Sequence, residues 1–254
     1  METSTQVLFG LGFILLTIAL AAWQRLEIIG NLIVTSGRLL LQMIVLTYLV
    51  AAVILLNHAI ATIFAILSLI VVAAILIRNQ VSQSIPYLLP ITVLSLITGI
   101  GLSLLYSQGL VVQARPWYAP TWLVPATGLL IGTVMNGAAI AAEQLTKALS
   151  YQVGEIETHL SLGASPAQAT APYYKAAVRS GLMPTLNTLT IAGLGTLPTL
   201  MSGAMLGGMG PLEAGAYQIL MFLMGLFASL VTIVLLCRSI IYQFFSPAAQ
   251  LLRW

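Results

Sequence analysis

Charged residues are scarce in this chain, where only six acidic and nine basic side chains stand among 254 residues that are 59% hydrophobic. A water-soluble domain usually has about 25% charged residues, so a soluble fold is excluded. The composition therefore predicts an integral membrane protein. The basic residues stand singly at the ends of apolar runs, which leaves no basic face for a phosphate backbone, and we expect no nucleic-acid partner.

The residue patterns that an enzyme would use are also missing. Neither lysine follows a glycine, which excludes a G-x-x-x-x-G-K-[ST] loop for ATP, and there is no G-x-S-x-G sequence. The single cysteine, Cys237, excludes an intrachain disulfide. His58 and His159 fall on opposite predicted membrane faces, and no two carboxylates share a span. We predict that this chain is not an enzyme and binds no cofactor of its own.

Long apolar runs make up most of what is present. Seven of them contain no Asp, Glu, Lys, Arg or His: 7–23, 39–57, 60–77, 87–105, 121–142, 185–206 and 215–237. Each has about the ~17 to 25 residues that a helix needs to cross the hydrocarbon of a bilayer. The predicted fold class is an all-α polytopic membrane protein with about seven transmembrane helices in a single domain, 1–254. The second and third runs are joined only by Asn57, His58 and Ala59, which predicts an antiparallel pair with a very tight turn.

Basic residues are distributed unevenly between the two predicted membrane faces. With seven crossings, Arg115 falls alone on one face. The other eight share the opposite face: Arg25, Arg38, Arg78, Lys147, Lys175, Arg179, Arg238 and Arg253. The positive-inside rule then predicts an outside N-terminus, a cytoplasmic C-terminus and a cytoplasmic region 143–184. The opening residues METSTQ contain no Lys or Arg, so we expect no cleaved signal peptide.

The polar stretch from Glu155 to Pro172 has the pattern of two helices joined by a tight link. Gly163 is typical of a residue that follows a helix C-terminus. Ser165 and Pro166 are typical of a helix N-cap and a first helical position. The pattern predicts a helix-turn-helix elbow between the fifth and sixth spans.

Polar and flexible residues within the spans indicate where a translocation pathway would lie. Arg38 and Gln42 share one helix face at the cytoplasmic end of the second span, and Asn136 with Gly137 interrupts the fifth. The sixth span contains two glycines and Pro198, which predict a kinked helix that can repack. The candidate pathway residues are Arg38, Gln42, Met135, Asn136, Pro198, Met201, Ser202 and Met205.

Each of these residues also has a purely structural interpretation. Gln42 and Asn136 would serve equally well in hydrogen bonds between neighbouring helices, which are worth ~1 kcal/mol in membranes. The small residues Gly193, Gly203 and Gly207 would permit close helix packing. The cluster favours a pathway more strongly than any single member does.

Two further features have alternative interpretations. Met201, Met205 and Met209 form a stripe that would suit a soft ion such as Cu(I), although adaptable core filling is the commoner use of methionine. Pro211 and Glu213 have the pattern of a helix start, with proline first and a carboxylate in the first turn. The alternative for Glu213 is a cation contact at the outer mouth of a pathway.

The first half of the elbow matches a family motif. Residues Glu157 to Gly163 read E-T-H-x-x-x-G and resemble the E-A-A-x-x-x-G motif of ABC transporter permeases, in which a cytoplasmic elbow docks into a cleft of a separate ATPase subunit. Thr158 and His159 replace the two alanines, and the hydrophobic-proline pair that usually follows soon after the glycine is displaced to Met183-Pro184. The resemblance implies an ATPase-coupling role for Glu155, Glu157, His159, Leu162, Gly163, Ala164, Ser165 and Pro166.

A broader resemblance covers almost the whole chain. Its motifs are G-x-x-M-N-G at 132–137, RSGLMPTLN at 179–187, LP-x-x-MSG at 197–203 and GPLEAGAYQI at 210–219. In this order they resemble the FetB family of bacterial permeases, which also includes plant aluminium-tolerance membrane proteins. The resemblance implies a permease of the plasma membrane (the inner membrane of a bacterium), paired with a FetA-like ATPase and involved in iron export and resistance to oxidative stress. ATP and Mg²⁺ would bind to that partner, and two copies of this chain would form a homodimer that works by alternating access.

The residues of the spans restrict the substrate. No span contains a carboxylate or a histidine, and the remaining neutral oxygen ligands bind hard cations weakly, so we expect no tight metal site. Iron then crosses without a tight site, or the substrate is a complex or an organic molecule. A link of the plant relatives to nucleotide-sugar transport keeps an organic substrate open. Two other classes remain as alternatives: an ATP-independent channel or secondary transporter, and a non-transporting scaffold whose elbow recruits a cytoplasmic partner.

Overall fold

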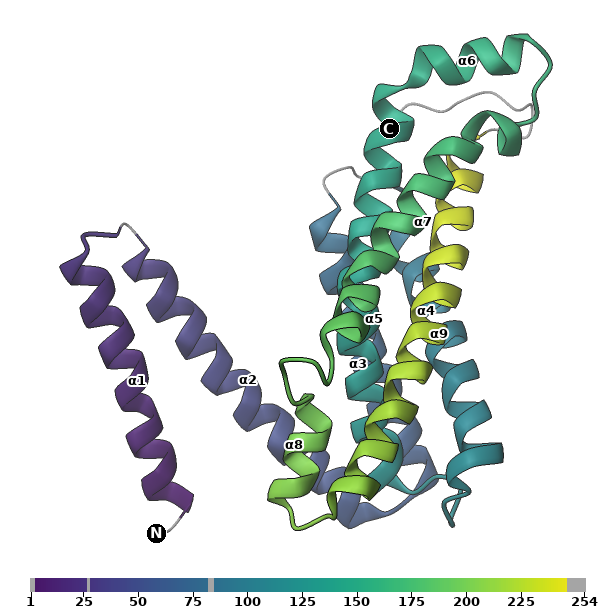
Figure 1. Ribbon diagram of the computed structural model, residues 1–254. Coiled ribbons are helices and arrows are strands. Elements are labelled where there is room, and N and C mark those ends of the chain that lie inside the picture. Colours follow the sequence, from purple (N-terminus) through teal and green to yellow (C-terminus); the bar gives the residue numbers. More distant parts are fainter. Residues whose placement is uncertain (1–2, 27, 82–84, 246–254) are drawn as a thin grey trace. The chain divides into compact units, whose positions relative to one another are not determined.

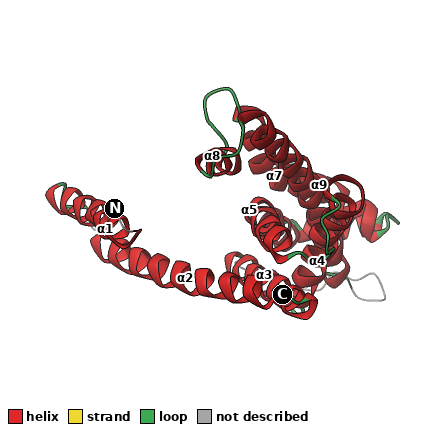
Figure 2. Cartoon of the chain, turned by 90° about the horizontal axis from the view of Figure 1, so that it is seen from below, coloured by secondary structure: helices red, strands yellow, loops and turns green. Residues whose placement is uncertain are grey.

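The regular elements of the computed structural model are helical throughout the residues that it describes, 3–26, 28–81 and 85–245, with side chains described from residue 12 onward (Figure 2). In chain order they are α1 (Thr3–Trp23), α2 (Ile29–Leu56), α3 (Ala59–Gln80), α4 (Leu88–Tyr106), the π-helical η1 (Ser107–Val112), α5 (Pro120–Tyr151), α6 (Val153–Ser161), α7 (Pro166–Ile191), α8 (Thr199–Leu206) and α9 (Pro211–Gln243) (Figure 1).

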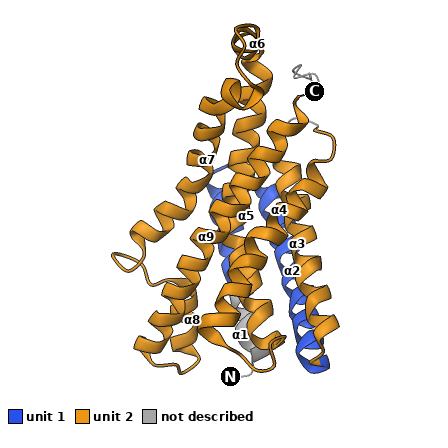
Figure 3. Ribbon diagram, turned by 90° about the vertical axis from the view of Figure 1, so that its right-hand side faces the viewer, with its two compact units in different colours: residues 1–56 blue, residues 57–254 orange. Residues whose placement is uncertain are grey.

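The chain separates into two compact units, residues 1–56 and residues 57–254 (Figure 3). In the first unit, α1 packs against α2. The second unit contains α3 to α9. That the two units form one transmembrane domain stays a prediction.

Helices α5 and α9 are central to the second unit. Helix α5 packs against α3, α7 and α9, while α9 also packs against α4, α7 and α8. Leu130, Val134 and Leu145 of α5 and Ile233 and Leu236 of α9 are at most 1% exposed. Because lipid tails are as apolar as these side chains, their burial supplies mainly dispersion contacts, and close approach of the helices becomes important.

Glycine residues allow that close approach at two crossings. A Cβ atom added at Gly99 of α4 would overlap Thr232 Oγ1 of α9, and one added at Gly137 of α5 would overlap the carbonyl oxygen of Gly181 of α7. A Cβ at Gly181 would lie 2.7 Å from the Gly137 oxygen. These helices therefore meet backbone to backbone at positions where no side chain fits.

The alternative interpretation of Gly193, Gly203 and Gly207, that they permit close helix packing, finds no support within the described chain. An added Cβ at Gly193 or Gly203 would meet nothing within 4 Å, and one at Gly207 would meet only backbone oxygens of its own helix, 3.3 and 3.5 Å away. Gly137 likewise does not interrupt the fifth span with Asn136, because α5 runs continuously through both residues. The sequence motif at 132–137 therefore pointed to the correct part of α5, but Gly137 serves close packing against α7 and does not interrupt the helix.

Membrane-spanning helices account for most of the chain, which confirms a polytopic helical membrane protein. Among the described residues, five helical segments are long and apolar enough to cross a bilayer: α2, α3, α4 with η1, α5 and α9. The described apolar part of α1, Gly12–Trp23, is shorter. The count of seven spans is therefore not supported.

The predicted sixth span, 185–206, is wrong as a continuous helix. Helix α7 ends at Ile191, and α8 begins only at Thr199. Gly193 has a φ of +78°, which lies outside the helical region, and its N–H bonds to the Thr196 oxygen at 3.2 Å instead of continuing the helix. Pro198 takes an extended conformation as the N-cap of α8 and lacks an N–H of its own. Together these residues break the segment instead of kinking it.

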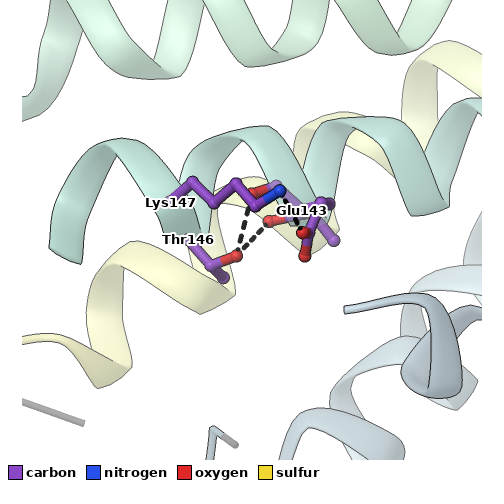
Figure 4. A network of polar contacts seen from close by, with 4 residues as sticks. Glu143, Thr146 and Lys147 are labelled. Carbon is purple, nitrogen blue, oxygen red and sulfur yellow. Dashed lines mark hydrogen bonds and ion pairs between the residues drawn. The ribbon is translucent and has the colours of Figure 1, made fainter. Parts of the chain in front are cut away.

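The fifth helix is longer than its apolar run. Its last turns continue nine residues past the predicted end at 142, to Tyr151, because Leu145, Thr146 and Leu149 remain fully buried. The Thr146 hydroxyl donates to the Ala142 oxygen at 2.9 Å, and Lys147 Nζ lies 2.8 Å from Glu143 Oε1, one helical turn away (Figure 4). The predicted polar region 143–184 is thus helical from its beginning.

Two smaller local predictions are confirmed. Asn57 adopts a left-handed conformation (φ +39°) and His58 is the N-cap of α3, where its Nδ1 accepts a 3.3 Å hydrogen bond from the Ile60 N–H, so the link after α2 is tight. The antiparallel pairing of α2 and α3 stays a prediction. Helix α9 begins at Pro211, with the exposed Glu213 in its first turn.

Candidate functional site: an elbow at one end and a cavity beside a broken helix

The C-terminus of α6 is closed by a Schellman motif. Gly163 has a φ of +89°, its N–H bonds to the Leu160 oxygen at 3.0 Å, and the Ala164 N–H bonds to the His159 oxygen at 3.0 Å. These are the two hydrogen bonds that satisfy the last carbonyl groups of a helix before the chain turns away. Gly163 thus ends the helix in the local role predicted for it.

The N-cap of α7 is Ser165, two residues after Gly163, and it forms a capping box. The Gln168 N–H donates to Ser165 Oγ at 3.3 Å, and the Ser165 N–H donates to Gln168 Oε1 at 2.9 Å. Pro166 is the first residue of the helix. Ser165 and Pro166 therefore also take their predicted local roles, and both helix ends at this link are stabilised by local hydrogen bonds.

Helix α6 is attached by apolar packing of Ile156 and Leu160 and by a hydrogen bond from α7. Ile156 is fully buried in the core. The Tyr173 hydroxyl of α7 donates a 2.7 Å hydrogen bond to Glu155 Oε2 of α6. Burial, and secondly this hydrogen bond to a carboxylate, raise the pKa of Tyr173 to about 12. The tyrosine therefore stays neutral and keeps donating across the range of physiological pH.

Most other residues of α6 and its flanks face outward. Tyr151 before the helix is 76% exposed and Leu162 after it is 79% exposed, and Glu157 and His159 are exposed between them. Of the eight residues predicted to contact a partner, Ala164 and Pro166 are half-buried and the others are exposed: Glu155, Glu157, His159, Leu162, Gly163 and Ser165. The result is a mixed apolar and charged surface on a short helix at one end of the second unit, with α8 at the opposite end (Figures 1 and 3).

The candidate pathway residues are divided between the units. Arg38 and Gln42 are exposed on α2 in the first unit. The other six belong to the second unit. Met135 is half-buried and Asn136 exposed on α5; around α8, Pro198, Met201 and Ser202 are half-buried and Met205 is 38% exposed. Core filling, the common use of methionine, applies instead to Met221 and Met224 of α9, which are 7% and 5% exposed.

A cavity of about 360 Å³ lies beside the broken helix. Five segments contribute to its wall: α5, the end of α7, the link 192–198, the start of α8, and α9. The lining residues are Leu129, Thr133, Thr188, Ile191, Ala192, Thr196, Leu197, Pro198, Thr199, Leu200, Gln218, Met221 and Phe222. Only Pro198 among them was predicted as a pathway residue, so sequence reasoning missed four threonines and a glutamine.

Gln218 holds the two helices of this region together. It is 7% exposed on α9, and its Oε1 accepts a 3.1 Å hydrogen bond from the Met201 N–H in the first turn of α8. The N-cap residue of α8, Pro198, makes no side-chain cap, so Gln218 supplies the acceptor from another helix. A lone glutamine in the apolar run 215–237 was the signal in the sequence for this role.

Similarity to known proteins extends over the same length. Residues 4–245 match the model of the family described as Uncharacterised protein family (UPF0014). The UPF0014 membrane protein slr1647 of Synechocystis is 37% identical over 95% of this chain and 93% of its own length. The Arabidopsis thaliana protein ALUMINUM SENSITIVE 3 is 29% identical over 94% of this chain and 86% of its own length.

A more distant relative is a permease by name. The Escherichia coli protein named "Probable iron export permease protein FetB" is 24% identical over 98% of this chain and 95% of its own length. No solved structure matches. The resemblance to FetB and to the plant aluminium-related proteins is therefore confirmed across the chain, which belongs to the UPF0014 family of membrane proteins.

Proposed function

We propose that this chain is the membrane-spanning permease subunit of an ABC transporter. Two copies would pair with two cytoplasmic ATPase subunits that bind ATP and Mg²⁺, and closure of the ATPases would switch the pathway between its two sides. The chain itself would not be an enzyme. The cargo class suggested by the name of the FetB relative is iron, and export of another metal or of an organic compound is the alternative.

The observation that carries this proposal is the construction of α6. A helix of nine residues is capped at its C-terminal end and followed at once by a capped α7, so its geometry is fixed, while most of its side chains face outward. A defined helix that presents exposed Leu162 beside Glu157 and His159 suits docking into a cleft of a second protein, because an apolar anchor with charged neighbours gives both affinity and orientation.

Charge distribution supports a cytoplasmic position for α6. Helices α3, α5 and α9 end, and α4 and α7 begin, at the α6 end of the second unit (Figure 1). Arg78, Lys147, Lys175 and Arg238 lie toward this end, Arg179 lies at the middle of α7, and Arg115 lies in the connection at the opposite end. The bias favours the cytoplasm for the α6 end by the positive-inside rule, and it does not depend on the number of spans.

Co-purification with an ATPase subunit tests the proposal. Leu162→Ser and Glu157→Lys should each reduce recovery of the ATPase and substrate-stimulated ATP hydrolysis by at least about tenfold, if each removes ~1.4 kcal/mol of docking energy. Leu212→Ser is the matched control, because Leu212 is 93% exposed at the other end of the unit.

Two results would contradict the proposal. One is a chain that never co-purifies with an ATPase and whose transport is unchanged by Glu157→Lys. The other is substrate flux in liposomes that contain neither ATPase nor ATP, which would assign the chain to channels or secondary transporters. Intact partner binding without any flux would instead assign it to membrane scaffolds.

A further inference from the structure

The cavity beside the broken helix has the size of a small-molecule site. Its volume of about 360 Å³ falls within the range of ~300 to 1,000 Å³ that is usual for ligand pockets. Its lining combines apolar walls, among them Ile191, Leu200 and Phe222, with four threonines and a glutamine, and it contains no charged side chain. It is therefore chemically suited to an organic ligand and poorly suited to a bare ion.

Irregular backbone in this wall presents unpaired donors. Residues 192–198 are non-helical within an apolar stretch, and such backbone is tolerated at membrane depth where it lines a polar cavity. The N–H groups of Thr199 and Leu200 begin α8 and have no partner within that helix. No hydrogen-bond acceptor for either is found among the described residues.

Gln218 adds a second, independent set of donors. Its Oε1 is fixed as the acceptor, because its partner is the Met201 N–H. The Nε2 amide group on the other side of the same carbon then carries two hydrogens, for which the described part of the chain offers no acceptor. Since Gln218 is only 7% exposed and lines the cavity, a ligand there would satisfy this amide.

The threonine hydroxyls do not reverse this excess of donors. Thr133 and Thr188 donate their hydroxyl hydrogens to helix carbonyls at 2.9 Å, the oxygens of Leu129 and Pro184, and so offer lone pairs. Thr196 and Thr199 have no hydrogen-bond partner for their hydroxyls in the described structure and are able to donate. The partial positive charge at the N-terminus of α8 acts in the same direction as the free N–H groups.

We infer that this cavity binds an oxygen-rich organic anion, either free or as the outer layer of a metal chelate, and does not bind a bare metal cation. The inference deepens the proposed permease function by naming the cargo chemistry. A bare divalent or trivalent ion would meet free donors and a positive helix end, with no carboxylate, imidazole or thiol in the lining to neutralise it. An anionic oxygen group would accept from Gln218, Thr199 and Leu200 together.

Thiol labelling of the full chain in membranes measures this charge preference directly. The background is Cys237→Ala, because Cys237 is the single cysteine and is fully buried. Thr188→Cys and Thr196→Cys place a thiol in the cavity wall. Each is treated with an anionic sulfonatoethyl or a cationic trimethylammonioethyl methanethiosulfonate, and both rates are normalised to those of free cysteine.

Both cavity cysteines should be labelled, with a normalised preference for the anionic reagent of about 3- to 30-fold, the range expected when a helix terminus attracts one charge and repels the other. Thr190→Cys is the matched control, because Thr190 donates to the i−4 carbonyl of α7 at 2.8 Å as Thr188 does, but does not line the cavity. The inference is overturned if the two cavity cysteines are labelled no faster than Thr190→Cys. It is also overturned if the cationic reagent labels them as fast as the anionic reagent or faster.

Protection from labelling identifies the source of the anion. If the free anion binds, citrate alone at millimolar concentration should slow labelling of Thr196→Cys at least about tenfold. If the chelate binds, ferric citrate should slow labelling by the same factor and citrate alone should not. The inference is contradicted if ferrous ion alone protects the cysteine, or if neither citrate nor ferric citrate protects it. Because labelling needs no ATPase, a failed cavity and a failed ATPase docking are separate outcomes.

Discussion

The crossing of α5 and α7 gives the sharpest test of the structure. Gly137→Ala would place a methyl group onto the carbonyl oxygen of Gly181. That atom belongs to the backbone, so no side-chain rotation relieves the overlap, and the helices have to separate. Overpacking of this kind costs about 1 to 3 kcal/mol. Gly132→Ala on the same helix adds the same methyl group where nothing lies within 4 Å.

In both variants, replacing glycine with alanine raises helix propensity and stabilises the helix by up to ~1 kcal/mol. Their difference in unfolding free energy therefore isolates the overpacking cost, and Gly137→Ala should be the less stable by about 1 to 3 kcal/mol. Equilibrium unfolding of the purified chain in detergent micelles, followed by circular dichroism, measures it. Equal stability of the two variants would show that α5 and α7 are not in backbone contact.

Three other predictions concern the broken helix and the elbow. Gly193→Ala should destabilise the fold by about 1 to 2 kcal/mol, because only glycine adopts its positive φ without strain, while Gly195→Ala should change little; the unfolding midpoint compares them. Burial and the hydrogen bond to Glu155 raise the pKa of Tyr173, so this tyrosine should ionise near pH 12. A spectrophotometric pH titration measures this as the difference in phenolate absorbance between the wild type and Tyr173→Phe. The wild type should accordingly lose relative stability as pH rises from about 10 toward 12, where only the unfolded chain ionises this tyrosine; a signal near pH 10 would contradict the contact. Ser165→Ala should cost about 1 kcal/mol by removing the capping box, whereas Ser165→Asp should restore most of it in the same unfolding assay.

Local chemistry explains why the helix ends around Gly163 and Ser165 were predictable. Gly163, Ser165 and Pro166 have conformational preferences that depend on the chain within a few residues of each, and the hydrogen bonds that fix them join neighbours. The start of α9 at Pro211 was predictable for the same reason. Features of this kind need no knowledge of tertiary packing.

The prediction of the sixth span was wrong because apolar composition does not distinguish a continuous membrane helix from an apolar segment that contains a break. The run 185–206 has the length and hydrophobicity of a span, yet Gly193 has a left-handed conformation and Gln218 of α9 supplies the missing cap of α8. That stabilisation comes from a side chain of another helix, 17 residues beyond Met201, so it depends on how α8 and α9 pack and not on local residue preferences. The cavity threonines were missed likewise, since Thr133 and Thr188 become neighbours only when α5 and α7 cross.

Helix α7 connects the two candidate sites. It begins at the capping box of Ser165, passes the backbone contact at Gly181, and ends at Ile191 in the cavity wall. Its 26 residues span roughly 39 Å at 1.5 Å per residue. Helix α5, which leads directly into α6, also contributes Leu129 and Thr133 to the wall of the cavity. In the proposed transporter, docking at α6 would therefore reach the cavity through α5 and α7, whose backbones are in contact at Gly137 and Gly181.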